Sequence, residues 1–267
     1  MSRPAGPVDL DAAYAGLVDA MRSRGRVLVA FSGGVDSGLV ARVAHDALGP
    51  DALAVVADAE SFARWELEEA LAEAEGIGIP ARVVGLSELA NPSYAANPSN
   101  RCFFCREGLA DVLVPIARRE GFAAIADGVH MSDLGDDRPG IRAMDAAGFW
   151  HPLVEAGLAK PDVRALARGL RLSFADKPSN ACLSSRIPHG TPITVELLRQ
   201  VESAEAYLRG LGFRQVRVRH EGDTARIEVA PDDVPRLRAV EADVAGAFRR
   251  RGYGRVVVDP RGYRSTA

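Results

Sequence analysis

Short apolar runs alternate with longer amphipathic segments over the first two thirds of the chain. The runs at 26–31, 52–57, 81–84 and 123–126 predict buried strands, while the segments at 9–23, 62–75 and 105–120 predict helices. A further helix follows the turn at 32–36 and extends to about residue 48. Strands that alternate with helices indicate βαβ units. The pattern therefore predicts an α/β domain with a parallel sheet and helices on both faces.

The pattern changes after a Ser-, Pro- and Gly-rich stretch at 178–192 that reads as a loop carrying Cys182. We expect a helix at 194–209 capped by Thr194, strands at 213–219 and 224–229, a helix at 233–251 and a strand at 255–258. This is a small α+β domain. The expected domains are therefore 1–185 and 186–267. The polar, glycine-rich segment at 133–148 predicts a loop, and Pro161 suits the first turn of another helix.

Composition places the chain among ordinary globular proteins, with 47% hydrophobic and 26% charged residues. It has no apolar run of about 18 residues and no secretory signal pattern, so we expect a cytoplasmic protein. The net charge of −3 is uneven, with 18 basic and 25 acidic residues up to Ser185 and 15 basic and 11 acidic residues beyond it. The basic part suits an anionic ligand, or it is a solvated arginine-rich surface.

Lysine and cysteine are both rare. Only Lys160 and Lys177 among the 33 basic residues are lysines, which makes each of them informative because arginine does not replace a compact charge everywhere. The three cysteines are Cys102, Cys105 and Cys182, and an odd number argues against a disulfide framework. A metal, cluster or catalytic role gains weight accordingly.

The sequence SGGVDS at 32–37 lies between the first predicted strand and its helix. Glycines let the backbone turn its amides toward an anion, the helix offers its N-terminus, and serine hydroxyls donate to phosphate oxygens. The loop resembles that of the PP-loop ATP pyrophosphatases, which have Rossmann-like sheets. The resemblance implies ATP as cosubstrate, pyrophosphate as leaving group and a Mg²⁺ ion positioned by Asp36. The nucleotide-binding candidates are Ser32, Gly33, Gly34, Val35, Asp36 and Ser37.

Two further motifs contain the cysteines: NPSNRCFFC at 97–105 and DKPSNACLSSR at 176–186. With DGVHMSD at 127–133, EAGLAKPDVRALAR at 155–168 and VRVRHEGDTARIEV at 216–229, nearly the whole chain resembles the LarE sulfur transferases of nickel-pincer nucleotide synthesis. The resemblance implies adenylation of a carboxylate of pyridinium biscarboxylic acid mononucleotide. Sulfur then displaces AMP to give a thiocarboxylate, in a pathway that serves lactate racemase.

The resemblance implies two sources of sulfur. In one branch of the family a single cysteine, matched by Cys182, gives up its sulfur and becomes dehydroalanine. In the other, three cysteines matched by Cys102, Cys105 and Cys182 hold a 4Fe-4S cluster whose fourth iron carries the sulfide. Three thiolates leave one iron open, so the cysteine count favours the cluster. A zinc site completed by a histidine (His130, His151 or His189) and a buried structural pair at 102 and 105 stay open.

Other residues match family positions. Arg217 and Arg219 match residues that bind the substrate phosphate, and an arginine pair suits that role. Glu205 and Glu228 match acidic positions near the active site and are candidate metal ligands. We expect Lys177 to contact the charge developing at the α-phosphate, and we treat Arg186 similarly. Asp127 and Asp133 are candidates for nucleotide or metal binding. A surface or structural role is the alternative for each of these residues.

Competing functions stay open. Other PP-loop enzymes with cysteine pairs thiolate tRNA, but they would need a strongly basic RNA-binding domain, which a net charge of −3 does not suggest. An amide-forming synthetase would not need the cysteines, and a non-catalytic nucleotide-binding protein would not release pyrophosphate. We expect a small-molecule nucleotide substrate, no nucleic acid, no membrane and a homo-oligomer. His130 and the pair Phe174-Ala175 depart from the family pattern, which bears on the substrate fit.

Overall fold

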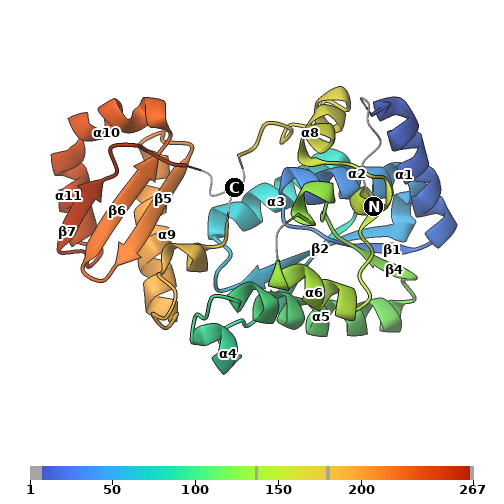
Figure 1. Cartoon of the computed structure of the whole chain (residues 1–267), viewed down its shortest axis with the longest axis horizontal. Coiled ribbons are helices and arrows are strands. Elements are labelled where there is room, and N and C mark those ends of the chain that lie inside the picture. The colour runs from blue at the N-terminus through green and yellow to red at the C-terminus, as the bar shows by residue number, and fades with distance from the viewer. Residues whose placement is uncertain (1–7, 136–137, 179–180, 265–267) are drawn as a thin grey trace. The chain divides into compact units, whose positions relative to one another are not determined.

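The computed structural model describes residues 8–135, 138–178 and 181–264, which divide into two compact units (Figure 1). The first unit comprises Met1–Glu88 and Asn100–Asn180, and the second comprises Leu89–Ser99 and Ala181–Ala267. The segment 89–99 belongs with the second unit because it is hydrogen-bonded to the chain after Cys182. The Tyr94 hydroxyl lies 2.6 Å from the Ser184 hydroxyl, and the Asn97 amide donates to the carbonyl of Pro188 at 2.8 Å.

The sheet of the first unit has four parallel strands in the order β3-β2-β1-β4. It confirms the α/β fold class. The order reverses direction at β1, since the chain moves outward to β2 and β3 and then returns to add β4 on the other side. Ligands of open α/β sheets bind at such a switch point, beyond the carboxyl ends of the strands. The strands are β1 (Val27–Ala30), β2 (Ala52–Ala59), β3 (Ala81–Leu86) and β4 (Ala124–Ala126).

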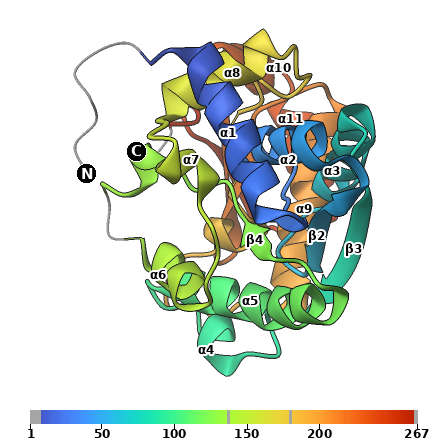
Figure 2. The ribbon, with the colours of Figure 1, turned by 90° about the vertical axis from the view of Figure 1, so that its right-hand side faces the viewer.

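Helices cover both faces of this sheet (Figure 2). Alternate residues of β1 point to opposite faces, so Val27 and Val29 join one apolar cluster while Leu28 joins the other. The first cluster includes residues of α1 (Leu10–Arg24), α2 (Val35–Leu48), α3 (Arg64–Ile77), α7 (Pro152–Glu155) and α8 (Lys160–Gly169). The second is covered by α5 (Arg101–Glu120) and α6 (Pro139–Ala146).

The expectation of a loop at 133–148 was wrong over residues 139–146. The short turn η2 (Met131–Asp133) leads into this region, and residues 139–146 form α6. Pro139 takes the first helical turn, where its missing N–H costs nothing. Ala143 and Met144 are buried against α5. Two adjacent apolar residues in a polar segment do not form a helical repeat, so the sequence did not reveal this helix.

The second unit is a three-stranded sheet, in the order β5-β6-β7, that packs against helices. β5 (Val216–Glu221) and β6 (Thr224–Val229) are antiparallel, and β7 (Arg255–Val258) is parallel to β6. α9 (Val195–Gly210) begins as expected at Thr194, whose hydroxyl accepts from the Leu197 amide at 3.3 Å. The single helix expected at 233–251 was wrong. Val240 separates α10 (Val234–Ala239) from α11 (Glu241–Arg249), which lets both helices bury apolar side chains in the same cluster.

Short elements complete the two units. They are η1 (Gly49–Asp51), α4 (Pro92–Ala95), η3 (Leu183–Arg186) and η4 (Pro231–Asp233). The stretch 178–192, which reads as a loop from its sequence, therefore contains a helical turn directly after Cys182. Within the described ranges, no helix has the length and apolar character needed to cross a membrane.

Candidate functional site

The loop between β1 and α2 is pressed against α3. Gly33 has a φ of +66°, a conformation that favours glycine, and a Cβ at this position would lie 2.7 Å from the Cβ of Ala70. The Ser37 hydroxyl lies 3.1 Å from that of Ser32 and accepts from the Ser32 amide at 3.2 Å. The sequence therefore produces a closed turn whose next residues begin α2, with the amides of the first helical turn at its end.

The loop after β4 meets the start of α2. A Cβ on Gly128 would lie 2.6 Å from the Ser37 amide nitrogen, so only a glycine lets this backbone approach. β1 and β4 are neighbours at the switch point of the sheet, and their two loops are consequently in direct contact. This is the position at which the fold predicts an anion-binding site.

Asp36, in the first turn of α2, is paired with Lys160 at the start of α8. The Lys160 ammonium donates to both carboxylate oxygens at 2.6 Å, and His130 Nε2 lies 3.8 Å from Asp36 Oδ1. Both side chains of the ion pair are only about one quarter exposed (27% for Asp36 and 26% for Lys160). A carboxylate and an ammonium group are therefore held together at the loop. The sequence placed Asp36 there and singled out Lys160 only by the rarity of lysine.

Lys177 reaches the same loop from the segment after α8. Its ammonium donates to the carbonyl of Gly33 at 2.9 Å and to Glu73 Oε1 at 2.8 Å, and it lies 3.1 Å from Glu69 Oε2. Burial raises the pKa of Glu73, the Lys177 ammonium partly opposes this, and the charge of Glu69 adds to it. Both lysines of the chain thus lie at the SGGVDS loop, each in contact with a carboxylate.

The segment that carries Lys177 is anchored to the helices beneath it. The ring of Phe174 packs against Gly38 of α2 so closely that a Cβ there would lie 2.3 Å from a ring carbon. Arg164 of α8 donates to the carbonyls of Ala175 at 2.9 Å and Lys177 at 3.0 Å. These contacts fix the backbone from which the Lys177 side chain extends.

Asp127 and His151 form a buried pair beside the β4 loop. His151 Nδ1 lies 2.7 Å from Asp127 Oδ1, and its Nε2 lies 3.0 Å from Asp145 Oδ1. Burial lowers the pKa of His151, but the hydrogen bonds and charges of Asp127 and Asp145 outweigh it and raise the pKa overall. Asp127 also accepts from the Val129 amide at 3.0 Å. The pair therefore stiffens the loop that touches α2. Asp133, a few residues further on, is paired with Arg138.

Cys102 and Cys105 lie at the start of α5, one turn apart and therefore on one face of the helix. Cys102 is exposed and Cys105 is partly exposed, which disfavours the alternative of a buried structural pair. The positive end of the helix dipole favours negative charge at this place. Cys182 belongs to the second unit and is also partly exposed.

Four positions after Cys182, Arg186 enters the core of the second unit. It donates to both oxygens of Glu205 at 2.8 and 3.1 Å, and Glu205 Oε1 also accepts from the Val218 amide at 2.9 Å. Both side chains are almost completely buried (0% and 1% exposed). Arg186 additionally donates to the Cys182 carbonyl at 3.2 Å. Glu205 thus has a bidentate partner that fixes the Cys182 turn, and its role as a metal ligand stays a prediction.

Glu228 lies between two arginines on the sheet of the second unit. It accepts from Arg226, and Arg219 Nε donates to its Oε2 at 3.1 Å. Arg226 also reaches Asp259 at 3.2 Å, and Arg219 donates to the Ser185 carbonyl at 2.9 Å. These contacts hold both arginines in fixed positions. As with Glu205, the metal-binding role expected of Glu228 stays a prediction.

Arg217 has a different environment. It is 7% exposed, and within the described residues no hydrogen bond or ion pair holds its guanidinium, which lies 4.3 Å from the centre of the Tyr263 ring. Burial lowers its pKa most, and the charges of Arg186 and Arg219 add to this. A buried cation without a partner carboxylate is costly unless an anion binds it. Arg217 is therefore a buried cation with no hydrogen bond or ion pair to an acidic residue in the described part of the second unit, and its role in binding the substrate phosphate stays a prediction.

Sequence reasoning missed several residues at these places. Glu73, Arg226 and Tyr263 carried no signal, since single charged or aromatic residues on helices and strands are common. Lys160 did carry a signal in the sequence, because it is one of only two lysines among 33 basic residues. No group of three or more His, Cys, Asp or Glu residues within the described ranges is arranged to hold a metal ion. Of the histidines considered for zinc, His151 lies against two aspartates, and His130 lies 3.1 Å from Asp133.

The fold and the SGGVDS loop at its switch point define a PP-loop ATP pyrophosphatase domain. The NAD synthase family matches residues 14–101. Among relatives, an uncharacterised protein of Synechocystis sp. is 46% identical over 90% of each chain. Pyridinium-3,5-bisthiocarboxylic acid mononucleotide synthase of Lactiplantibacillus plantarum is 38% identical over 93% of this chain and 91% of its own length. The tRNA-specific 2-thiouridylase of Caulobacter vibrioides is 29% identical over 74% of this chain and 62% of its own length.

The second of these relatives is similar over almost its entire length. The chain belongs to the LarE family, of which that synthase is a member.

Proposed function

We propose that the protein is an ATP-dependent sulfur transferase that acts on a carboxylate of pyridinium biscarboxylic acid mononucleotide. A carboxylate oxygen attacks the α-phosphorus of ATP and expels pyrophosphate, which gives an acyl adenylate. Sulfide then attacks the acyl carbon and expels AMP, which leaves a thiocarboxylate. The product name of the Lactiplantibacillus relative, a bisthiocarboxylic acid mononucleotide, supports sulfur incorporation at two carboxylates.

The observation that carries the proposal is the meeting of the β1 loop, both lysines and Asp36 at the switch point of the sheet. Backbone amides of the loop and of α2 supply donors for the pyrophosphate oxygens. Asp36 is the residue that would hold Mg²⁺, sharing its carboxylate with Lys160, which lies 2.6 Å away. The ion would neutralise the leaving group. Lys177, at the Gly33 carbonyl, is the candidate to contact the charge developing on the phosphates.

The second unit supports the part of the proposal that concerns the substrate. A mononucleotide carries a phosphate, and the buried guanidinium of Arg217 lacks an acidic partner among the described residues. Arg219 lies two residues away on the same face of β5 and is oriented by Glu228. Two arginines suit the fork geometry of a phosphate. We assign them to substrate binding.

The sulfur source is the finer part of the proposal. Cys102 and Cys105 are accessible thiols on one face of α5, which fits ligands of a 4Fe-4S cluster completed by Cys182. Such a cluster would supply sulfide at its open iron. Four residues lie between Lys177 and Cys182, which limits their Cα separation to about 18 Å. Cys182 therefore also suits the alternative of a single sacrificial donor near the loop.

The test combines product analysis with a metal count. With ATP, Mg²⁺, sulfide and the biscarboxylic acid mononucleotide, the chain should release pyrophosphate and AMP and convert the acid to a thiocarboxylate. If the release of pyrophosphate and AMP and the formation of thiocarboxylate do not exceed those of a no-enzyme control, the proposed function is wrong. Iron and acid-labile sulfide after anaerobic reconstitution, with loss of both on Cys102→Ala, would support the cluster. Without iron, loss of sulfur from Cys182 after one turnover would support the sacrificial route.

Thiolation of tRNA is the second candidate, because the Caulobacter relative is a tRNA-specific 2-thiouridylase. It would use the same adenylation chemistry on an RNA base. Binding of bulk tRNA by the full chain, followed by ATP-dependent incorporation of labelled sulfur into that RNA, would favour it. Sulfur incorporation into the mononucleotide alone would exclude it as the main activity.

A further inference from the structure

The SGGVDS loop carries an unusual charge for an anion site. Three carboxylates, those of Asp36, Glu69 and Glu73, face two ammonium groups, those of Lys160 and Lys177. A site that binds only by side-chain charge would have the opposite balance. The excess negative charge comes from α3, whose Glu69 and Glu73 lie one turn apart on the side toward Lys177.

Glu73 is the closer and more buried of these two carboxylates. Its side chain is 12% exposed, while that of Glu69 is 39% exposed. A Cβ on Gly33 would lie 3.1 Å from Glu73 Oε2, so the carboxylate touches the turn of the loop itself. Glu73 Oε2 is buried and accepts no hydrogen bond from the described residues. One oxygen of this carboxylate thus accepts from Lys177, while the other lies against the turn of the loop.

Lys177 has no donor left over in this arrangement. An ammonium group has three N–H donors, and the Gly33 carbonyl, Glu73 and Glu69 all lie within 3.1 Å of its nitrogen. A phosphate oxygen can reach Lys177 only by replacing one of these partners. An ammonium group suits such exchange, because it is a compact charge on a flexible stem and has no fixed fork.

We infer that Glu73 competes with pyrophosphate for the Lys177 ammonium and thereby weakens the grip of the loop on this product. Glu73 acts through Lys177, so it is a positioning residue. In the nucleotide-bound state Lys177 moves toward the phosphates, and after adenylation the carboxylate draws it back as pyrophosphate leaves. This inference rests on the proposed function, and it adds a device for releasing the product of the first step.

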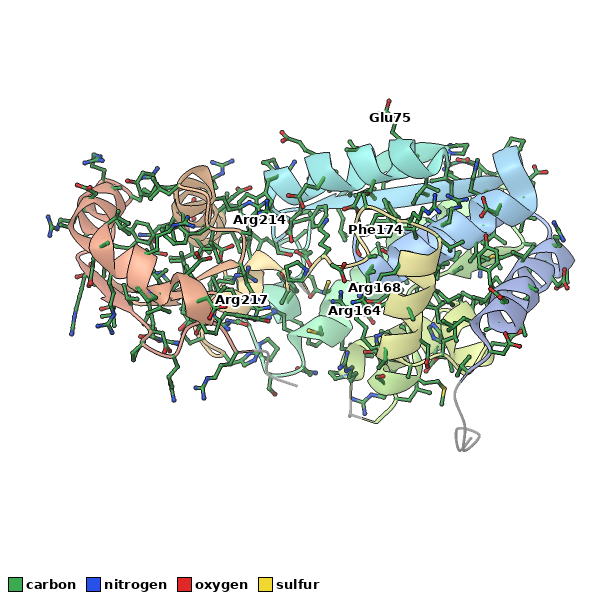
Figure 3. All side chains as sticks on the ribbon, turned by 90° about the horizontal axis from the view of Figure 1, so that it is seen from above. Glu75, Arg164, Arg168, Phe174, Arg214 and Arg217 are labelled. Carbon is green, nitrogen blue, oxygen red and sulfur yellow. The ribbon has the colours of Figure 1, made fainter. Side chains whose placement is uncertain are left out.

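The test measures binding of magnesium pyrophosphate to the full chain by calorimetry. Glu73→Gln keeps the size of the side chain and removes its charge. We expect the Kd of this variant to fall about tenfold, because a neutral amide holds the Lys177 ammonium less tightly than a carboxylate does and so competes less with pyrophosphate for it. Glu73→Asp keeps the charge and should bind close to the wild type. Glu75→Gln is the matched control, because Glu75 projects away from the molecule on the outer side of α3 (Figure 3).

A second measurement separates competition for Lys177 from general repulsion. In a Lys177→Met background, Glu73→Gln should change the Kd by less than about twofold, since the contested ammonium is gone. The inference is wrong if Glu73→Gln binds magnesium pyrophosphate no more tightly than the wild type, or if it tightens binding equally in both backgrounds. Either result leaves the proposed function standing. Wild-type protein that binds no magnesium pyrophosphate at millimolar concentration would remove the proposed function together with it.

Discussion

The two units present cations to anions in opposite ways. In the first unit the cations at the loop are lysines, with Lys160 held by the carboxylate of Asp36 and Lys177 by those of Glu73 and Glu69. In the second unit they are arginines, and Arg219 is fixed by Glu228 while Arg217 lies buried over Tyr263. A lysine exchanges partners easily, whereas an arginine fork holds one geometry. The difference suggests that the first unit handles a group that arrives and leaves, and the second a group that stays bound through the reaction.

The largest expected effect is a loss of stability in the second unit, where the arginines lie. Glu205→Ala leaves the Arg186 guanidinium buried without its carboxylate. We expect the free energy of unfolding to fall by about 3–5 kcal/mol. Urea unfolding of the full chain measures it, with Glu196→Ala on the exposed face of α9 as the control. A loss no greater than that of the control would mean that the buried pair does not stabilise the second unit.

The next largest effect is on the rate of pyrophosphate release at the loop of the first unit. Asp36→Asn removes the charge that pairs with Lys160 and that would hold Mg²⁺. We expect the rate of pyrophosphate release to fall about a hundred- to a thousandfold, as for the loss of a residue that stabilises the transition state electrostatically. The measurement is single-turnover pyrophosphate release, with the melting temperature as a check on folding. A decrease of less than tenfold would remove Asp36 from the chemistry.

A smaller effect should separate the two units functionally. Arg217→Ala removes the buried guanidinium, and we expect a tenfold to hundredfold increase in KM for the mononucleotide, the size of one charged hydrogen-bonding group. The Kd for ATP should not change. Arg217→Lys should recover only part of the loss, because a lysine lacks the fork. An equal loss of ATP affinity would contradict the division of roles.

The smallest expected effect is on the pH dependence of stability, through the buried pair of His151 and Asp127 in the first unit. The pKa of His151 is raised in the folded protein above its ordinary value of 6.5, because Asp127 and Asp145 outweigh its burial. The folded state therefore binds more protons than the unfolded state above that pH. The stability from this pair is complete below pH 6.5 and is lost as the pH rises through the folded pKa. His151→Gln should flatten the melting temperature between pH 6 and 8, and an unchanged profile would exclude the pair as its cause.

The sequence predicts the sheet of the first unit well, because four apolar runs such as 26–31 are short and lie between helical segments. It predicts the loop at 32–37 equally well, because the motif and its neighbours agree. It does not predict α6, whose buried face has only Ala143 and Met144, nor the interruption at Val240. Contacts such as Glu73 with Lys177 join residues 104 positions apart, and no local pattern encodes them.

The fit between Gly38 and Phe174 has an evolutionary consequence. A Cβ at position 38 would lie 2.3 Å from the Phe174 ring, so the two positions share one volume. A larger residue at 38 is tolerated only if 174 becomes smaller, and neither change is neutral when it occurs first. We therefore expect the two positions to vary together among relatives. A lineage with a bulkier residue at 38 should also show a remodelled approach of the Lys177 segment to the loop.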